Sequence, residues 1–365
     1  MVKFNAENER TKRCYFEWEK EANGKSISTI DNMRNAIYLF EKFTKFKSFK
    51  QITKEDIIAF KKHLTQKLNL RTQEPISKTY LLHTSNYLIN LFKWLYGQKG
   101  YKQKINIADI AYFNLSDKDI QTARSPISKR YPTLEQLEHV IKNMPAETDV
   151  QKRNRAVIAL LTLTGARVTA VASLKIKHVN LEAERIDQHP QEVKTKYSKK
   201  IITFFFPVGD IFKTIFIEWV HFLKHEKLSG NNASLFPSTK LSLDENSQFS
   251  RQKLDAVAWQ TTACIRTIVK EAFEAAGLDY YNPHSFRNTI VNLGYQVCKT
   301  AEDSKAWSQN LGHSSLLTTF TSYGHIEEYS QGAIIKRLGK SDDDKPITMR
   351  DMQKLLAQNN TNITR

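Results

Sequence analysis

Residues 311–325 read LGHSSLLTTFTSYGH, and this stretch carries the pattern on which the fold assignment rests. A short helix is expected to end at Gly312, because glycine commonly terminates helices. A second helix is expected to begin at Ser314 or at the serine after it, because serine is a favoured helix cap. His313 would therefore lie in the joint between two helices, and Tyr323 follows ten residues later.

A second stretch suited to chemistry lies nearer the N-terminus, where residues 282–287 read NPHSFR. Pro283 suits the start of a helix. His284 and Arg287 are then three residues apart and share one helix face. Unpaired N–H groups and the helix dipole at this end favour an anion, so the pair makes a candidate phosphate site. An ordinary polar helix face is the alternative interpretation.

The third stretch, residues 161–167, reads LTLTGAR. An apolar helix is expected to end near Gly165, and Arg167 follows almost at once. An arginine beside a core helix is costly unless it is paired or solvated. Arg167 is therefore either a side chain that simply reaches the surface or a functional group.

The order of these three stretches resembles the tyrosine recombinase (phage-integrase) family. TGAR, then H-x-x-R, then LGH with a tyrosine about ten residues later match the family's motifs. Each motif is short, and their conjunction, order and spacing make the resemblance specific. It covers about residues 131–330. It extends more weakly to the helical N-terminal part, which is similar to the family's core DNA-binding domain.

The resemblance implies a role for each matching residue. Arg167 and Arg287 would bracket the scissile phosphate, for which a planar, permanently charged guanidinium is well suited. His284 and His313 would hydrogen-bond to the phosphate, and His284 is the better candidate to accept the tyrosine proton. Tyr323 would be the nucleophile, forming a 3′-phosphotyrosine and releasing a 5′-hydroxyl.

The family also implies a lysine general acid in a β-hairpin. Residues 192–200, EVKTKYSKK, offer four lysines. Lys194 best matches the family's position, at the end of a strand and before the turn, and Lys196 is the second candidate. Either could give the leaving 5′-oxygen its proton.

No cofactor is expected for this chemistry. A free tyrosine has a pKa of about 10, so it needs help to attack at neutral pH. Two arginines can stabilise the added charge of the transition state without a metal ion. Phosphodiester energy is kept in the phosphotyrosine bond, so rejoining requires no ATP, and the sequence has no Walker-type loop.

Two positions depart from the family's pattern. Three residues after the first arginine the family usually carries an acid that supports the active-site framework, and this chain has Ala170. After the second arginine a histidine is common, and this chain has Asn288. Every catalytic position is nevertheless filled, which predicts an active enzyme.

The sequence predicts a mostly α fold with a small antiparallel β-sheet, in two domains that form a C-shaped clamp on DNA. Residues 1–121 are expected to be a helical core DNA-binding domain, in which residues 1–23 form an amphipathic helical extension. Residues 122–132, TARSPISKRYP, have two prolines and no apolar periodicity, as in a linker. A mixed α+β catalytic domain over residues 133–340 and a tail over residues 341–365 would follow. The stretch after the nucleophile would contact a neighbouring protomer.

Helical periodicity dominates the N-terminal part. Residues 26–46 carry apolar side chains at helical spacing. A second helix is expected to begin at Thr53, whose partner Asp56 completes a capping arrangement, and a third near Ser77.

The second part changes between helical and strand patterns. Thr133 with Gln136 predicts a capped helix start, and residues 155–163 predict a helix that stops near the glycine. Within residues 175–207, the β-rich run that ends IITFFF suggests the antiparallel sheet. Further helices are expected over residues 211–223 and 254–276 and after Pro283.

The charge balance favours a polyanionic partner. Lys and Arg total 55 against 38 Asp and Glu, which gives a formal net charge of +17 and a pI near 9.5. Nucleic acid is the first candidate and an anionic membrane surface the second. Pro207, Asp210 and Lys213 interrupt the most apolar stretch, residues 201–223, so it is not a span of about 20 apolar residues. The N-terminus has no apolar signal core.

The cysteines indicate a reducing compartment. Cys14, Cys264 and Cys298 have neither metal-ligand spacing nor a disulfide pattern. A cytoplasmic protein, associated with the nucleoid in a prokaryotic host, is therefore expected.

Together, the sequence predicts a site-specific recombinase or integrase that acts on double-stranded DNA carrying a specific recombination site. The resemblance implies four protomers on two DNA sites, which exchange strands through a Holliday junction, with accessory DNA-bending or directionality proteins as possible partners. The alternatives within the same chemistry are a type IB topoisomerase and a telomere resolvase. A non-catalytic DNA-binding protein of the same fold is the alternative outside it, and a basic peripheral membrane protein explains the charge but none of the motifs.

Overall fold

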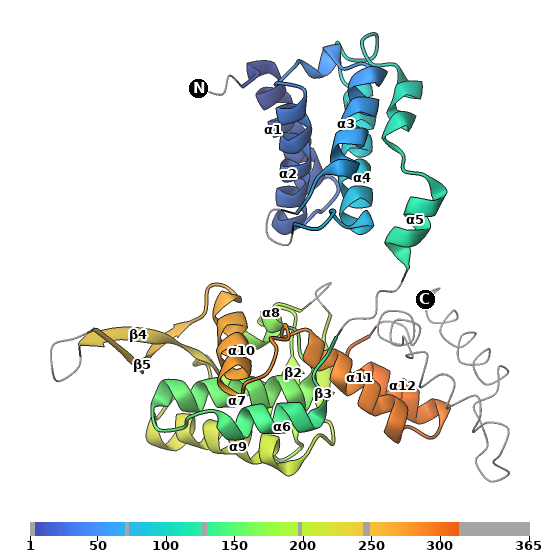
Figure 1. Ribbon diagram of the computed structural model, residues 1–365. Helices are drawn as coiled ribbons and strands as arrows, with labels where there is room; N and C mark the ends of the chain where they lie inside the picture. Colours follow the sequence, from blue (N-terminus) through green and yellow to red (C-terminus); the bar gives the residue numbers. More distant parts are fainter. Residues whose placement is uncertain (1–3, 70–72, 126–129, 196–198, 244–248, 314–365) are drawn as a thin grey trace, which may run out of the picture. The chain divides into compact units, whose positions relative to one another are not determined.

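The computed structural model of the protein describes residues 4–69, 73–125, 130–195, 199–243 and 249–313 (Figure 1). The chain divides into two compact units, with the division between Ser125 and Pro126. Each unit has its own hydrophobic core. The predicted nucleophile Tyr323, the second lysine candidate Lys196 and the tail over residues 341–365 lie outside the described residues.

The N-terminal unit is built from helices (Figure 1). They are α1 (Ala6–Glu21), α2 (Ile27–Phe43), α3 (Lys54–Gln66), α4 (Lys78–Tyr96) and α5 (Asp117–Arg124), with short 3₁₀ turns at Phe49–Gln51 and Ile107–Phe113. The last turn of α5 includes Thr122, so the first residues of the predicted linker are helical.

Side-chain caps fix where these helices begin. Ser26 accepts from a backbone N–H of the first turn of α2, and Ser77 does the same for α4. Thr53 and Asp56 form the predicted capping box of α3. These caps satisfy N–H groups that the helix itself leaves unpaired.

Aromatic rings fill the core of the N-terminal unit. Phe40 meets Phe60 edge to face at 5.0 Å between ring centroids and Phe92 at 5.8 Å. Such T-shaped contacts match the positive edge of one ring to the negative face of another. Tyr15 of α1 is fully buried in the same core, so α1 packs as part of this unit.

The second unit contains helices and two small antiparallel sheets. Its helices are α6 (Leu134–Asn143), α7 (Asp149–Thr164), α8 (Val168–Val171), α9 (Asp210–His221), α10 (Ala263–Ala275), α11 (Ser285–Val297) and α12 (Ala301–Asn310), with a 3₁₀ turn at Ile176–His178 and a π-helical turn at Phe222–Glu226. Its strands are β1 (Val179–Asn180), β2 (Arg185–Gln188), β3 (Ile201–Phe204), β4 (Pro237–Leu243) and β5 (Phe249–Ala258). The predicted mostly helical fold with a small antiparallel sheet is therefore confirmed.

Helix α7 is the centre of this unit. All of its residues from Ala156 to Thr164 are buried, and α6, α9, α10 and α11 contact it. The helix ends at Gly165, as its sequence predicted. The C-terminal end of the helix is therefore buried, and the chain that follows it reaches half-buried positions at Ala166 and Arg167.

The first sheet has the order β1-β2-β3, and both strand pairs are antiparallel. Ile186 of β2 lies opposite Val179 of β1 and Thr203 of β3. Ile186 and Thr203 are buried while Ile202 is exposed, which is the alternation of a sheet with one covered face.

The second sheet was not expected from the sequence. Strands β4 and β5 form a two-stranded ribbon that projects from the helices (Figure 1). The prediction of a helix from Leu254 was wrong, because Leu254 to Ala258 complete β5 and α10 begins only at Ala263. The local apolar spacing fits a helix, but Thr239 and Pro237 of β4 supply cross-strand partners that no local pattern reveals.

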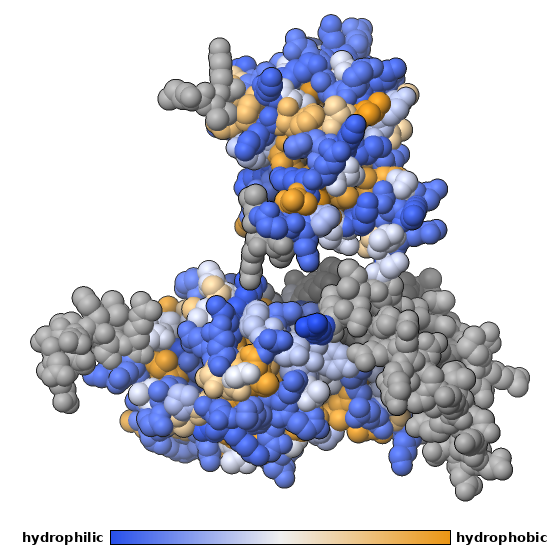
Figure 2. Space-filling model, viewed as in Figure 1, coloured by the Kyte–Doolittle hydropathy of each residue, from blue (hydrophilic) through white to orange (hydrophobic). Residues whose placement is uncertain are grey.

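Hydrophilic side chains predominate on the visible face of each unit, with smaller apolar patches between them (Figure 2). Among the described residues, no helix combines the length and the hydrophobicity needed to cross a bilayer.

Candidate active site

Gly165 sets the direction of the chain that leads to Arg167. Its φ of 56° lies in the left-handed region, where a side chain costs conformational energy. An added Cβ would also lie 3.0 Å from Ile290 Cδ1 and 3.2 Å from Leu311 Cδ2. The backbone N–H of Ala166 donates to Thr164 Oγ1, which tightens the turn. Arg167 then stands at the N-terminal cap of α8.

Arg287 is held in place by backbone groups from two other segments. Its side chain is 3 % exposed, and Nη1 donates to the Gly165 carbonyl at 2.9 Å. Nη2 donates to the Leu311 carbonyl, and Nε donates to His313 Nε2 at 3.2 Å. A planar guanidinium with three bonds of this kind has little rotational freedom. Its position is therefore set by the fold.

His313 occupies a backbone turn of defined geometry at the end of α12. The N–H of Gly312 donates to the Gln309 carbonyl and that of His313 to the Ser308 carbonyl, which together form a Schellman motif. Gly312 has a φ of 70°, and an added Cβ would meet Ile201 Cγ2 at 2.9 Å. Glycine is therefore required at this position both for its backbone angle and for its contact with the sheet.

His284 lies at the start of α11, where it is the N-cap residue. Its own N–H donates to Asn282 Oδ1, and its side chain is exposed. The positive charge of protonated His284 lowers the pKa of His313, so the two rings are close enough to interact electrostatically. The predicted pair of His284 and Arg287 thus stands on the first turn of one helix, where the helix dipole favours an anion.

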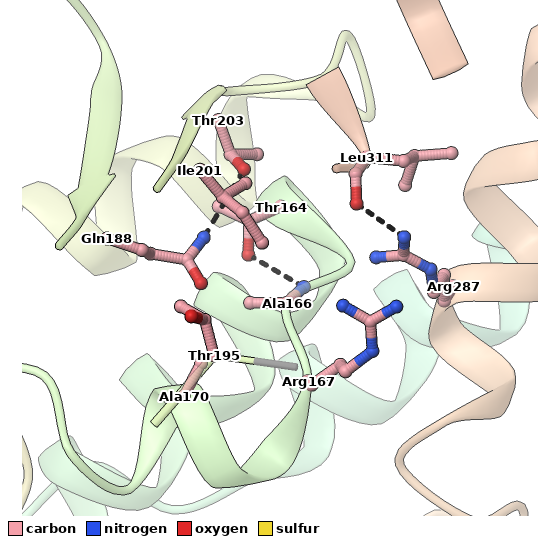
Figure 3. Close-up of a pocket in the computed structure, with 10 residues that line it drawn as sticks. All are labelled: Thr164, Ala166, Arg167, Ala170, Gln188, Thr195, Ile201, Thr203, Arg287 and Leu311. Carbon is pink, nitrogen blue, oxygen red and sulfur yellow. Dashed lines mark hydrogen bonds between the residues drawn. The ribbon is translucent and has the colours of Figure 1, made fainter. Parts of the chain in front are cut away.

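A small pocket brings the two predicted arginines together (Figure 3). Its walls are formed by Thr164, Ala166, Arg167, Ala170, Gln188, Thr195, Ile201, Thr203, Arg287 and Leu311. Figure 3 shows both guanidinium groups on the same side of this pocket. The Arg167 guanidinium makes no hydrogen bond or ion pair with any of the described residues. Two such cations side by side make a site for an anion with several oxygens.

The positive charges around His313 affect its protonation. Burial, and then the charges of Arg287, Arg167 and His284, lower the pKa of His313 to about 3. The ring is therefore neutral at pH 7. Because its Nε2 accepts from Arg287, the proton of the neutral ring lies on Nδ1.

This lowered pKa predicts that the DNA-free protein loses stability in mild acid. Its unfolded state takes up a proton on His313 below about pH 6.5, whereas the folded state does so only near pH 3. The contribution is therefore intact above about pH 6.5 and decreases as the pH falls. With allowance for solvent screening, we expect the free energy of unfolding to fall by about 1 kcal/mol by pH 5. Urea unfolding of the wild type and of His313→Gln at pH 7.5 and pH 5 measures this loss of stability. Parallel pH profiles for the two proteins would contradict the prediction.

Lys194 lies in the segment between β2 and β3, close to the pocket but outside its walls. Its side chain is exposed, and its N–H donates to Ser173 Oγ at 3.0 Å. The preceding Val193 is buried, and the following Thr195 lines the pocket. The backbone at Lys194 is therefore anchored beside the two arginines.

An ion cluster anchors the same segment two residues before Lys194. Glu192 accepts from Lys177 Nζ at 2.6 Å and lies 3.0 Å from His178 Nε2. Hydrogen bonds from these two groups lower the pKa of Glu192 to about 2.

The two departures from the family pattern have different surroundings. Ala170 is buried and forms part of the pocket wall, so the space beside Arg167 lacks a side-chain carboxylate at this position. Asn288 is buried directly after Arg287, and its Oδ1 has no hydrogen-bond partner within the described part of the chain. Across the described residues, no group of three or more His, Cys, Asp or Glu side chains is placed to hold a metal ion.

The pocket and its motifs fall inside a family match. The model of the phage integrase family matches residues 131–329, which is more than half of the 365 residues. The chain belongs to the phage integrase family. The comparison with curated proteins found no match.

Solved structures of tyrosine recombinases share the fold of this phage integrase family member. A dimer of lambda integrase (75–356) bound to a COC' core site has a TM-score of 0.60 at 14% identity, and the match covers 93% of this chain and 99% of that one. XerH bound to a palindromic difH substrate has a TM-score of 0.56 at 21% identity, with 88% and 83% covered. A lambda integrase tetramer bound to a Holliday junction has a TM-score of 0.57 at 15% identity, with 83% and 76% covered.

The structure adds groups that the sequence of this integrase-family chain did not reveal. The carbonyls of Gly165 and Leu311 orient Arg287, and the polar side chains of Gln188 and Thr203 line the pocket. Backbone carbonyls leave no sequence signal. A buried glutamine and a buried threonine on facing strands become visible only once the strand register is known.

Proposed function

We propose that this protein is a site-specific DNA recombinase, which cleaves and rejoins strands through a covalent 3′-phosphotyrosine at Tyr323. The observation that supports it most directly is the pocket in which the guanidinium groups of Arg167 and Arg287 face one ligand site, with the His313 ring against Arg287. Membership of the phage integrase family supports the same reaction.

In the proposed reaction the two arginines bind the non-bridging oxygens of the scissile phosphate. The Tyr323 oxygen attacks phosphorus, and the bond from phosphorus to the 5′-oxygen breaks. Charge builds up on the non-bridging oxygens in the transition state, and two fixed guanidinium groups stabilise it there. Because Arg287 is already oriented by backbone carbonyls, little reorganisation is needed when the phosphate binds.

Proton transfers complete the proposed step. His284, exposed at the start of α11, accepts the phenolic proton of Tyr323. Lys194 donates a proton to the leaving 5′-oxygen, which leaves as a hydroxyl. His313 donates from Nδ1 to a phosphate oxygen. Rejoining reverses these transfers, with the 5′-hydroxyl as the nucleophile, and consumes no ATP.

The proposed ligand is duplex DNA that carries a specific recombination site. The net charge of +17 supports a polyanion. We infer that both units contact the DNA. By analogy with the lambda integrase tetramer bound to a Holliday junction, we also infer a homotetramer that passes through such a junction. A DNA-bending or directionality protein could assist. A cytoplasmic, nucleoid-associated location fits a DNA-acting member of this family.

A covalent-trapping assay tests this proposal. Nicked suicide duplexes that carry the candidate recombination site, taken from the flanks of the gene or element, are incubated with the full chain in EDTA. We expect a protein–DNA adduct on denaturing gels for the wild type and none for Tyr323→Phe. Tyr329→Phe, which removes the same hydroxyl from a tyrosine later in the same segment, should form the adduct normally.

The other outcomes distinguish the alternatives. No adduct on DNA that is shown to be bound indicates a non-catalytic DNA-binding protein of the same fold. An adduct that persists in Tyr323→Phe means that another residue is the nucleophile. Relaxation of supercoiled DNA without exchange between two sites would favour the type IB topoisomerase.

A further inference from the structure

The end of α12 is attached to the three-stranded sheet through the side chain of Asn310. Its Nδ2 donates to the Phe204 carbonyl at 2.9 Å, and its Oδ1 accepts from the Phe204 N–H at 2.7 Å. Among the described strands β3 stands at the edge of its sheet, next to β2. The two backbone groups of Phe204 are therefore those that a further strand would use. The amide of Asn310 takes the place of one residue of such a strand.

The backbone of the same residue is bound to the sheet as well. The Asn310 carbonyl lies at the end of α12, and it accepts from Thr203 Oγ1 at 3.0 Å. This bond satisfies one of the acceptors that a helix end leaves unpaired. Thr203 Oγ1 in turn accepts from Gln188 Nε2 at 3.4 Å. Two consecutive residues of β3 thus hold one residue of α12 by three hydrogen bonds.

The residues that follow Asn310 directly carry the groups of the site. The carbonyl of Leu311 binds Arg287, Gly312 packs on Ile201, and His313 accepts from Arg287. The Schellman motif fixes these residues relative to the last turn of α12. A shift of α12 along β3 would therefore move the partners of Arg287 by the same amount.

We propose that Asn310 is a positioning residue for the strand-cleavage reaction, because its pairing with the edge of β3 sets where His313 and the Leu311 carbonyl stand against Arg287. This inference rests on the proposed function. Asn310 itself touches no reacting atom in this scheme. Groups that stabilise a transition state must be held within about 0.5 Å of their productive positions. A misplacement of about 1 Å can cost about 100-fold in rate.

Two substitutions test this role. Asn310→Ala removes both side-chain bonds to Phe204. Asn310→Asp keeps the size and one acceptor oxygen but sets a second oxygen against the Phe204 carbonyl. We expect single-turnover cleavage of the suicide duplex to slow by about 10- to 100-fold in both variants. The DNA concentration for half-saturation should change by less than about threefold, because the lost interaction acts on the transition state. Gln309→Ala, which removes the neighbouring exposed amide, should cleave like the wild type.

A measurement on the DNA-free chain tests the structural part separately. Amide hydrogen exchange at Phe204 should be slow in the wild type and in Gln309→Ala, and faster in Asn310→Ala, because that variant lacks the oxygen that accepts from the Phe204 N–H. If Asn310→Ala fails to fold, Thr203→Val provides a second test, because it removes the bond to the Asn310 carbonyl, together with the longer bond from Gln188, and keeps both side-chain bonds of Asn310 to Phe204. It is also expected to slow cleavage more than it weakens binding.

The other possible results separate the positioning role of Asn310 from the proposed function. If the wild type cleaves and both Asn310 variants cleave at its rate, the positioning role is wrong and the proposed function stands. A loss of DNA affinity in step with the cleavage rate overturns the positioning role as well. If the wild type forms no adduct that depends on Tyr323, the proposed function fails. Unchanged exchange at Phe204 in Asn310→Ala would remove the structural basis of the positioning role.

Discussion

Arg167→Lys is expected to slow DNA cleavage by about 100- to 1,000-fold and to leave the unfolding of the protein unchanged. Lysine keeps the positive charge but offers a single ammonium in place of the planar fork that binds two oxygens. The Arg167 guanidinium has no hydrogen-bond partner among the described residues, so its replacement breaks no hydrogen bond of the described fold. Single-turnover trapping of the covalent adduct measures the rate, and urea denaturation measures the stability.

The control for this experiment is Arg266→Lys, the same change at an exposed arginine of α10. It should alter neither the rate nor the stability. Cleavage at the wild-type rate by Arg167→Lys would show that this arginine does not bind the scissile phosphate. A large loss of stability would show that Arg167 has a structural role instead.

The same substitution at the second arginine of the pocket should have a different result. Arg287→Lys is expected to abolish cleavage and also to destabilise the protein by about 2–4 kcal/mol. Lysine cannot reach the Gly165 carbonyl, the Leu311 carbonyl and His313 together, so buried acceptors lose their donors. The midpoint of urea unfolding should fall with no change in its slope.

The chemical change is identical in the two lysine variants, so a difference in their stability reports the different surroundings of the two arginines. Equal stability of Arg167→Lys and Arg287→Lys would mean that the three bonds of Arg287 contribute nothing to folding. A destabilised Arg287→Lys protein that still cleaves would separate the structural role of this arginine from the proposed catalytic one.

Local features of the structure were predictable from the sequence where a single segment determines them. Helix starts at Thr53 and Thr133 are capping boxes because their partners are three residues away. The end of α7 at Gly165 and the end of α12 before Gly312 follow from the conformational freedom of glycine. These boundaries depend on residues that are close together in the sequence, so the sequence alone predicts them.

Features that depend on distant partners were not predictable in this way. The strand from Phe249 to Ala258 exists because β4 pairs with it, and its local pattern fits a helix equally well. Asn310 reads as an ordinary polar residue at a helix end until β3 is placed beside it. In general, the sequence identifies the side chains of the candidate site, whereas the groups that orient them come from packing between segments.

The anchoring of Arg287 has a consequence for biosynthesis. It joins Gly165, made early on the ribosome, to Leu311 and His313, made much later. A nascent chain that ends before Leu311 can hold Arg287 through one carbonyl at most. The pocket that holds Arg167 and Arg287 is therefore completed only late in translation, when the segment that carries Leu311 and His313 has been made.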